Sequence, residues 1–199
     1  MIRIALVGEI ASGKTFAAKC FKYPVFNADK EVKKIYKNNR QCFKKLKKKF
    51  PKKIKNFPIK KSEIKKIVNI KNIKTLSKIV HPFVRIELKK FLKKNKKNKY
   101  IVLDIPLLIE NKLFKKSDIL IGVKTSKKII TKRLKKRGNF NKKLLNILKT
   151  QQLDIGKKFK LCNFIIENNS HKNNILKQIQ GIKKTLNDRS SFGYRNNRT

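Results

Sequence analysis

Eight residues near the start of the chain, GEIASGKT (8–15), fit the spacing G-x-x-x-x-G-K-[ST]. In loops of this kind, glycines allow a sharp turn and let backbone amides close around a phosphate group. Lys14 would then reach the β- and γ-phosphates of a nucleotide, and the Thr15 hydroxyl would bind Mg²⁺. Glu9 puts a negative charge in the loop. Because backbone amides form the cradle, we predict that its carboxylate points away from the phosphates.

The segments on both sides of this loop have the patterns that a phosphate site requires. The apolar run IRIALV (2–7) predicts a buried parallel strand, and KTFAAKCFK (14–22) predicts a helix. The positive end of that helix would face the phosphates. Together the strand, the loop and the helix predict a nucleotide-binding site.

Two aspartates could complete a phosphoryl-transfer centre, and each has a second interpretation. Asp29 ends the strand-like stretch YPVFNAD (23–29). There it could orient an acceptor hydroxyl and take its proton, or it could cap the helix that starts at Lys30. Asp104 lies in a strongly apolar run, where it could bind Mg²⁺ through water or pair with one of the many lysines. The spacing leaves both questions open.

Two arginines stand out because the chain otherwise uses lysine. Arg133 and Arg137 lie four residues apart on one face of a predicted helix, 126–137, with Ser126 as its expected N-cap. Arginine binds phosphate through a fork of N–H groups, so the pair predicts a clamp on transferring phosphates from a lid. The alternative is an ordinary solvated helix face.

The rest of the chain alternates between strand-like and helix-like patterns. Apolar runs predict strands at 100–110, ending at Pro106, and at 118–125 and 163–168. Apolar residues at helical spacing predict further helices at 141–161 and 171–187. This alternation predicts an α/β fold, with a parallel sheet and helices on both faces.

The middle and the end of the chain have patterns of their own. Residues 30–97 show helical spacing that is broken by Pro51, Pro58 and Pro82. This stretch is too long for one crossover, so we expect an inserted helical subdomain. The last residues, RSSFGYRNNRT (189–199), are basic and without a period, which predicts disorder.

The composition is dominated by lysine. The chain has 56 Lys plus Arg against 11 Asp plus Glu, a formal net charge of +45. Such a charge attracts polyanions. However, lysines occur in nearly every segment, which favours drift toward AT-rich codons over a dedicated nucleic-acid site. Three scattered cysteines and two histidines suggest no disulfide or zinc site. With no apolar run of about 20 residues and a strand-like start, we expect a soluble, cytoplasmic protein.

In order and spacing, these features resemble the dephospho-CoA kinase family over nearly the whole chain, about residues 1–187. The His-Pro pair and the run DIPLLIE are the most specific together. The stretches that carry the resemblance are GEIASGKT (8–15), FNAD (26–29), LSKIVHPFV (76–84), VLDIPLLIENKLF (102–114), KRLKKR (132–137) and QLDIGKKFKLCNFIIEN (152–168).

The resemblance implies a three-layer α/β P-loop kinase fold with a parallel five-stranded sheet, in a single domain of residues 1–188. The core would comprise 1–29 and 99–188, with a helical CoA-binding insert at about 30–98 and a lid at about 133–160. It also implies ATP and Mg²⁺ as cofactors, and transfer of the γ-phosphoryl group to the ribose 3′-hydroxyl of dephospho-CoA, giving coenzyme A. We expect a monomer whose partners are these small molecules.

Position by position, the resemblance assigns roles to individual residues. Asp29 would be the general base, Lys14 and Arg133 the other catalytic residues, and Thr15 the metal ligand. The residues expected to bind ATP are Gly8, Ala11, Ser12, Gly13, Lys14, Thr15, Phe16 and Arg137. Those expected to bind the acceptor are His81, Pro82, Leu107, Leu108 and Glu110.

The chain departs from the family pattern at several positions. Glu9 and Ala11 stand where family loops usually have glycine, and Ala11 would be tolerated there if its φ is negative. Asn163 replaces the usual acidic residue before FIIEN, and the lid is rich in lysine. The alternatives are another small-molecule P-loop kinase, of nucleoside monophosphate or shikimate type, and a nucleic-acid-binding P-loop protein. The His-Pro and DIPLL segments argue against the first.

Overall fold

The computed structural model describes residues 1–136, 142–169 and 172–191. Within them, five parallel strands form one sheet in the order β2-β3-β1-β4-β5. The central strands are buried along most of their length, as their apolar runs predict. The strands are β1 (Ile2–Val7), β2 (Val25–Asn27), β3 (Tyr100–Asp104), β4 (Ile119–Lys124) and β5 (Phe164–Glu167).

The register brings the carboxyl ends of the strands to one edge of the sheet. Ala5 of β1 pairs with Leu103 of β3 and with Leu120 of β4, and Asn27 of β2 pairs with Asp104. The loop after β1 therefore lies between two pairs of strand ends, β2 and β3 on one side and β4 and β5 on the other. In open α/β sheets this edge is where ligands bind.

Helices α1 (Lys14–Cys20) and α9 (Lys172–Ser191) cover one face of the sheet. Their apolar side chains share a core with β1, β3, β4 and β5. This core includes Ile4, Leu6, Ala17, Ala18, Phe21, Val102, Ile121, Ile166, Ile175 and Ile179.

The second half of α5 (Ile70–Lys94), the segment 105–109 and α8 (Ile155–Lys160) cover the other face. Val84, Leu88 and Phe91 of α5 pack against the apolar cluster that includes Ala5 and Leu103 of the sheet. A Cβ at Gly122 of β4 would lie 2.9 Å from the Phe159 ring of α8, so the missing side chain lets that helix approach the sheet. The expected three-layer α/β fold is confirmed.

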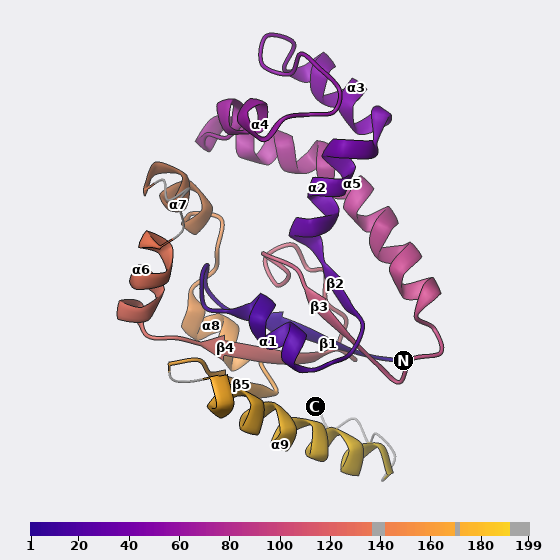
Figure 1. Cartoon of the computed structure of the whole chain (residues 1–199), viewed down its shortest axis with the longest axis vertical. Coiled ribbons are helices and arrows are strands. Elements are labelled where there is room, and N and C mark those ends of the chain that lie inside the picture. Colours follow the sequence, from indigo (N-terminus) through magenta and orange to yellow (C-terminus); the bar gives the residue numbers. More distant parts are fainter. Residues whose placement is uncertain (137–141, 170–171, 192–199) are drawn as a thin grey trace.

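The helices between β2 and β3 form a core of their own (Figure 1). They are α2 (Ala28–Asn38), α3 (Arg40–Lys49), α4 (Lys61–Ile67) and the first half of α5. Their buried apolar residues include Ile35, Cys42, Leu46, Ile54, Ile67, Leu76, Val80 and Phe83. Helix α5 thus contributes to two cores, that of this helical segment and that of the sheet. After β4 follow α6 (Lys127–Lys135) and α7 (Lys142–Lys149).

Several element boundaries differ from the sequence prediction. Pro82 lies inside α5 and does not break it. A proline there lacks the N–H of the helix ladder and crowds the carbonyl four residues earlier. The helix continues because both of its halves are anchored by apolar contacts. The predicted helix 141–161 is two helices, α7 and α8.

The end of the chain also differs from the prediction. Helix α9 continues to Ser191, so residues 189–191 are helical where we expected the tail to be disordered. Residues 192–199 lie outside the described part of the chain. Among the described helices, none combines the length and the apolar character that a bilayer crossing requires.

Candidate active site

The phosphate loop joins β1 to α1 through two glycines that no other residue could replace without strain. A Cβ at Gly8 would come within 2.7 Å of both the Ser12 hydroxyl and the Val123 carbonyl. Gly13 has a φ of +98°, in the region that favours glycine. Helix α1 begins directly after it, so the first-turn amides, which have no acceptor within the helix, lie at the loop.

Ala11 does not meet the condition of a negative φ under which we expected alanine to be tolerated in the loop. Its φ is +65°, not negative. For an alanine this left-handed conformation costs roughly 1–2 kcal/mol. Ala11 is 8% exposed and packs against Ile130 and Leu134 of α6. The methyl group is thus buried between the loop and α6, which offsets part of the strain.

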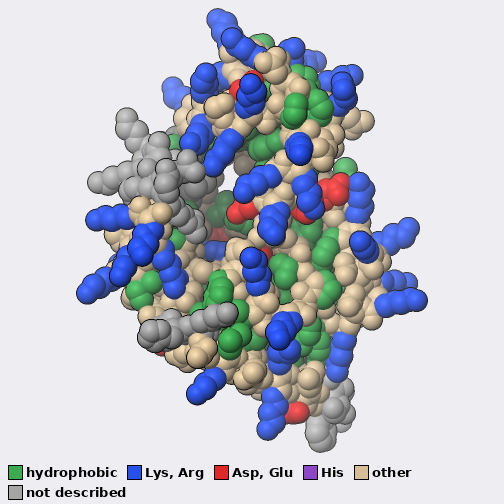
Figure 2. All heavy atoms as spheres, viewed as in Figure 1, with side chains coloured by type: hydrophobic (Ala, Val, Ile, Leu, Met, Phe, Trp, Pro, Cys, Tyr) green, Lys and Arg blue, Asp and Glu red, His purple; other side chains and the backbone are tan. Residues whose placement is uncertain are grey.

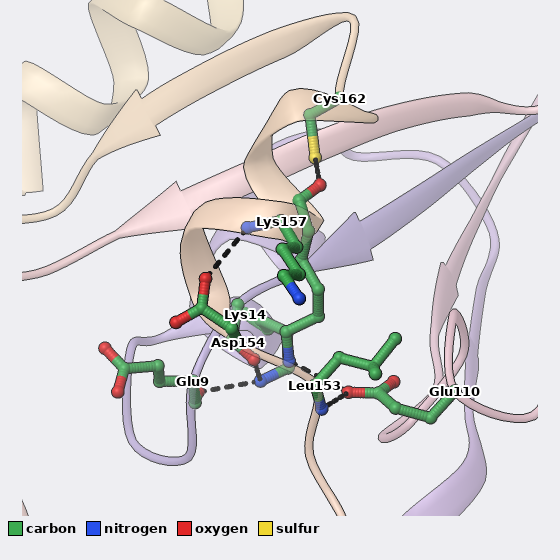
Figure 3. A network of polar contacts seen from close by, with 9 residues as sticks. Glu9, Lys14, Glu110, Leu153, Asp154, Lys157 and Cys162 are labelled. Atoms are coloured by element: carbon green, nitrogen blue, oxygen red, sulfur yellow. Dashed lines mark hydrogen bonds and ion pairs between the residues drawn. The ribbon is translucent and has the colours of Figure 1, made fainter.

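Lys14 folds back over the loop. Its ammonium donates hydrogen bonds of 2.9 Å to the carbonyls of Gly8 and Glu9. Burial lowers the pKa of Lys14 to about 8, with the charge of Asp104 opposing that shift. The ammonium is therefore partly desolvated, and an anionic ligand would stabilise its charged form. Figure 3 shows the Glu9 carboxylate directed away from the Lys14 ammonium.

Asp104 accepts hydrogen bonds from two elements beside the loop. The Thr15 hydroxyl donates to its Oδ2 at 2.6 Å, and the Asn27 amide donates to the same oxygen at 2.5 Å. Asp104 is 3% exposed. Its contacts with Thr15 and Asn27 support the metal interpretation over pairing with a lysine, because hydroxyl and carboxylate oxygens are the ligands that Mg²⁺ prefers. The oxygen donors of Thr15 and Asp104 therefore fit Mg²⁺.

Asp29 is not where the sequence pattern put it. Strand β2 ends at Asn27, and Asp29 lies in the first turn of α2. The helix cap is Asn27, whose side chain accepts from the Lys30 amide at 2.9 Å, so the capping interpretation of Asp29 is wrong. Asp29 is exposed, and its charge is one of those that raise the Lys14 pKa. It therefore lies at the solvent-accessible rim of the site.

A pocket next to Lys14 contains three of the residues predicted to bind the acceptor, Leu107, Leu108 and Glu110. Glu110 forms an ion pair with Lys158 of α8 at 3.0 Å, with side chains only 11% and 4% exposed. The Glu110 carboxylate also accepts from the Leu153 amide at 3.1 Å, so it joins three segments (Figure 3). The other pocket residues are Leu6, Val7, Gly8, Lys14, Ile105, Ile109 and Lys158.

His81 and Pro82 lie at the middle of α5, and neither lines that pocket. His81 is half-buried, and burial together with the charge of Arg85 lowers its pKa, so the imidazole favours the neutral form. Along α5 the His-Pro pair is flanked by Val80 and Phe83, which both belong to the core of the helical segment, and neither residue of the pair lines the pocket beside Lys14.

Arg133 binds the loop backbone and does not form a solvated helix face. Its guanidinium donates to the Ser12 carbonyl at 3.1 Å and to the Ala11 carbonyl at 3.4 Å. A second nitrogen donates to the backbone and side-chain oxygens of Asn168, at 3.2 and 3.0 Å. Burial lowers the pKa of Arg133. Arg137 lies outside the described residues, and Phe16 is 37% exposed on α1.

Comparison with known proteins decides the family. A family model described as dephospho-CoA kinase matches residues 2–174. This chain belongs to the dephospho-CoA kinase family. A protein of Wolbachia pipientis wMel named dephospho-CoA kinase is 34% identical, over 92% of this chain and 97% of the relative.

Solved structures show the same fold. A dephospho-CoA kinase from Campylobacter jejuni matches with a TM-score of 0.62 and 23% identity, over 92% of this chain and 96% of that one. The Thermus thermophilus protein TT1252 matches with a TM-score of 0.75 and 23% identity, over 94% and 97%. The P-loop kinase fold that the sequence predicted is confirmed, and the chain is a kinase of the dephospho-CoA kinase family.

Two buried residues of this kinase were missed at the sequence level. Lys158 was not singled out, because one lysine among so many carries no signal. Asn168 was noticed only as the end of the strand-like stretch 163–168, although its amide donates to the Ser12 carbonyl at 2.6 Å. Both act through contacts that are distant in sequence, 48 residues for Lys158 with Glu110 and 156 for Asn168 with Ser12.

Proposed function

We propose that this kinase transfers the γ-phosphoryl group of ATP to the ribose 3′-hydroxyl of dephospho-CoA, giving coenzyme A, in a reaction that requires Mg²⁺. Family membership supports the acceptor. The observation that carries the chemistry is the contact of Thr15 with Asp104 at 2.6 Å, next to the Lys14 ammonium. A hydroxyl, a carboxylate and a cation converge there on the end of a glycine loop, as phosphoryl transfer requires.

The residues that would hold Mg²⁺ are Thr15, directly, and Asp104, through water. The ion would neutralise charge on the β- and γ-phosphates. Lys14 would leave the carbonyls of Gly8 and Glu9 for the phosphates. Because its ammonium is already desolvated, it gives up only those two hydrogen bonds to do so. ATP would also contact Gly8, Ala11, Ser12, Gly13, Phe16 and Arg137.

Asp29 would orient the acceptor hydroxyl and take its proton. Two observations support this role: Asp29 is exposed at the start of α2, which leaves room for a bulky acceptor, and its charge is close enough to Lys14 to raise the pKa of that lysine. Arg133 would add positive charge beside the transferring group, because its guanidinium lies against the loop. The remaining acceptor contacts would come from His81, Pro82, Leu107, Leu108 and Glu110.

We also propose a function for each of two segments of the chain. Residues 30–98 would form the CoA-binding insert, since their own apolar core lets them act as a unit. Residues 133–160 would form the lid that excludes water from ATP. This range begins inside α6, whose Ile130 and Leu134 already contact Ala11 of the loop.

The chain would act in the cytoplasm as a monomer without a dedicated nucleic-acid partner. In Figure 2 the basic side chains are dispersed over the visible face and not gathered into one stripe, while acidic side chains lie beside the central hollow. A nucleic-acid site is expected to concentrate its positive charge. This dispersion supports compositional drift as the source of the +45 charge.

A coupled ATPase assay with a panel of acceptors tests the proposed function. Dephospho-CoA should give saturable, Mg²⁺-dependent turnover, and shikimate and nucleoside monophosphates should give none above the background hydrolysis. Product from dephospho-CoA should carry its new phosphate on the 3′-oxygen by ³¹P NMR. Turnover with another acceptor of the panel, and none with dephospho-CoA, would overturn the proposal.

A further inference from the structure

One carbonyl of the phosphate loop, that of Ser12, receives three side-chain donors from three different elements. The Asn168 amide donates to it at 2.6 Å, the Thr125 hydroxyl at 2.8 Å and the Arg133 guanidinium at 3.1 Å. Asn168 directly follows β5, Thr125 directly follows β4, and Arg133 lies on α6. A carbonyl oxygen has two lone pairs. Three donors are therefore more than enough to fix the direction of the Ser12 carbonyl.

Asn168 is the centre of this group. Its side chain is buried, and the residue is 3% exposed. Its backbone amide donates to the Lys124 carbonyl at 2.8 Å, which fixes the residue to the end of β4. Its side-chain oxygen accepts from Arg133 at 3.0 Å, so both ends of the side-chain amide are engaged. The orientation of Asn168 is therefore set from both strands and from α6.

Gly13 and Asn168 depend on one another. A Cβ at Gly13 would collide with the side-chain nitrogen of Asn168 and lie 3.4 Å from Arg133. The second glycine of the motif is thus needed for the close approach of Asn168 as well as for its positive φ. Any side chain at residue 13 would push Asn168 off the Ser12 carbonyl.

The direction of the Ser12 carbonyl controls a phosphate-binding group. The Ser12 carbonyl and the Gly13 N–H belong to one planar trans peptide unit, and they point in opposite directions. Holding the Ser12 carbonyl toward Asn168 therefore turns the Gly13 N–H away from Asn168. In loops of this type that N–H is one of the amides around the phosphate. A loop fixed beforehand loses less conformational entropy when it binds.

We propose that Asn168 is a positioning residue for ATP, which holds the Ser12–Gly13 peptide in its phosphate-binding orientation without touching the nucleotide. The inference rests on the proposed function only in taking a nucleotide phosphate as the ligand. It gives Thr125 the same role to a smaller extent, because its hydroxyl supplies one neutral hydrogen bond at 2.8 Å and its second contact, with the Asn168 carbonyl, is long at 3.5 Å.

Calorimetric titration with MgATP tests this role directly. The Asn168→Ala variant should bind ATP about tenfold more weakly, the equivalent of one lost hydrogen bond. Asn168→Asp should be weaker still, because it sets a carboxylate against the Ser12 carbonyl while keeping the acceptor for Arg133. Thr125→Val should lose about threefold. At saturating ATP, kcat with dephospho-CoA should stay within about threefold of wild type, since the reacting groups are intact.

Asn163→Ala is the matched control. Asn163 precedes β5, and its side chain accepts from the Leu120 amide of β4 at 2.9 Å, at the opposite end of the same strand pair. The Asn163→Ala substitution should lower the unfolding temperature without changing the affinity for ATP. The proposal is overturned if Asn168→Ala binds ATP as tightly as Asn163→Ala, or if its only defect is a smaller folded fraction. Because ATP binding is measured without an acceptor, the result is independent of whether dephospho-CoA is the substrate.

Discussion

The two sides of the phosphate loop are built from different chemistry. On the β3 side, Thr15, Asn27 and the buried carboxylate of Asp104 meet near the Lys14 ammonium. On the β4 side, Thr125, Arg133 and Asn168 bind backbone oxygens of the loop. The β3 side presents groups that can exchange partners with a metal and a phosphate. The β4 side holds the backbone that those groups depend on. Substitutions on the β3 side should therefore affect chemistry, and those of Thr125 and Asn168 on the β4 side should affect affinity or stability.

Removing the Lys14 charge should have the largest effect. Lys14→Ala should lower kcat/KM by about 10³-fold or more, because it deletes a charged donor at a site where single donors contribute about 10²–10³-fold. Lys19→Ala, on the exposed side of the same helix, removes an equal charge and should stay within about twofold of wild type. Steady-state kinetics with varied ATP measure both. Substantial activity in Lys14→Ala would place the catalytic cation elsewhere.

Substitution of Asp29 tests whether a residue at the rim of the β3 side takes part in the reaction as the general base. Asp29→Asn should lower kcat by about 10²–10⁴-fold, the usual contribution of a general base. ATP affinity should change little, because the phosphates are held by the loop. Glu31→Gln in the same helix turn, where Glu31 pairs with the exposed Lys34, is the control and should leave kcat unchanged. Wild-type turnover in Asp29→Asn would remove the base assignment.

The titration of Lys14 should appear in the pH profile. Burial lowers its pKa to about 8, and the charged form is the one that binds phosphate. Below pH 8, the titration of Lys14 should leave kcat/KM for ATP constant. Above pH 8, kcat/KM should fall, with a slope that approaches a tenfold decrease per pH unit. Bound phosphates favour the ammonium and raise its pKa, so kcat at saturating ATP should fall only at higher pH. A kcat/KM that stays constant up to pH 10 contradicts this assignment.

The two sides also differ in how far the sequence could predict them. The β3 side follows from local patterns: an apolar run, two glycines at fixed spacing, and an aspartate at the end of a strand. Even there, Asp29 and the helix cap were confused, because Asn27 and Asp29 are both good caps and only the backbone decides between them. The β4 side depends on where β5 lies in the sheet. Nothing in the sequence near Asn168 indicates that it meets Ser12, 156 residues away.

The smallest effect concerns Ala11, an alanine with a positive φ. Two alanine-to-glycine substitutions separate backbone strain from burial. At Ala17, buried inside α1, glycine should lower the free energy of unfolding by about 1–2 kcal/mol, through helix propensity and the lost methyl group. At Ala11 the same methyl loss is opposed by relief of a left-handed alanine, so the change should be under about 1 kcal/mol. Urea denaturation of both variants measures the difference. If Ala11→Gly lost as much stability as Ala17→Gly, Ala11 would carry no strain, and contact with α6 alone would explain its burial.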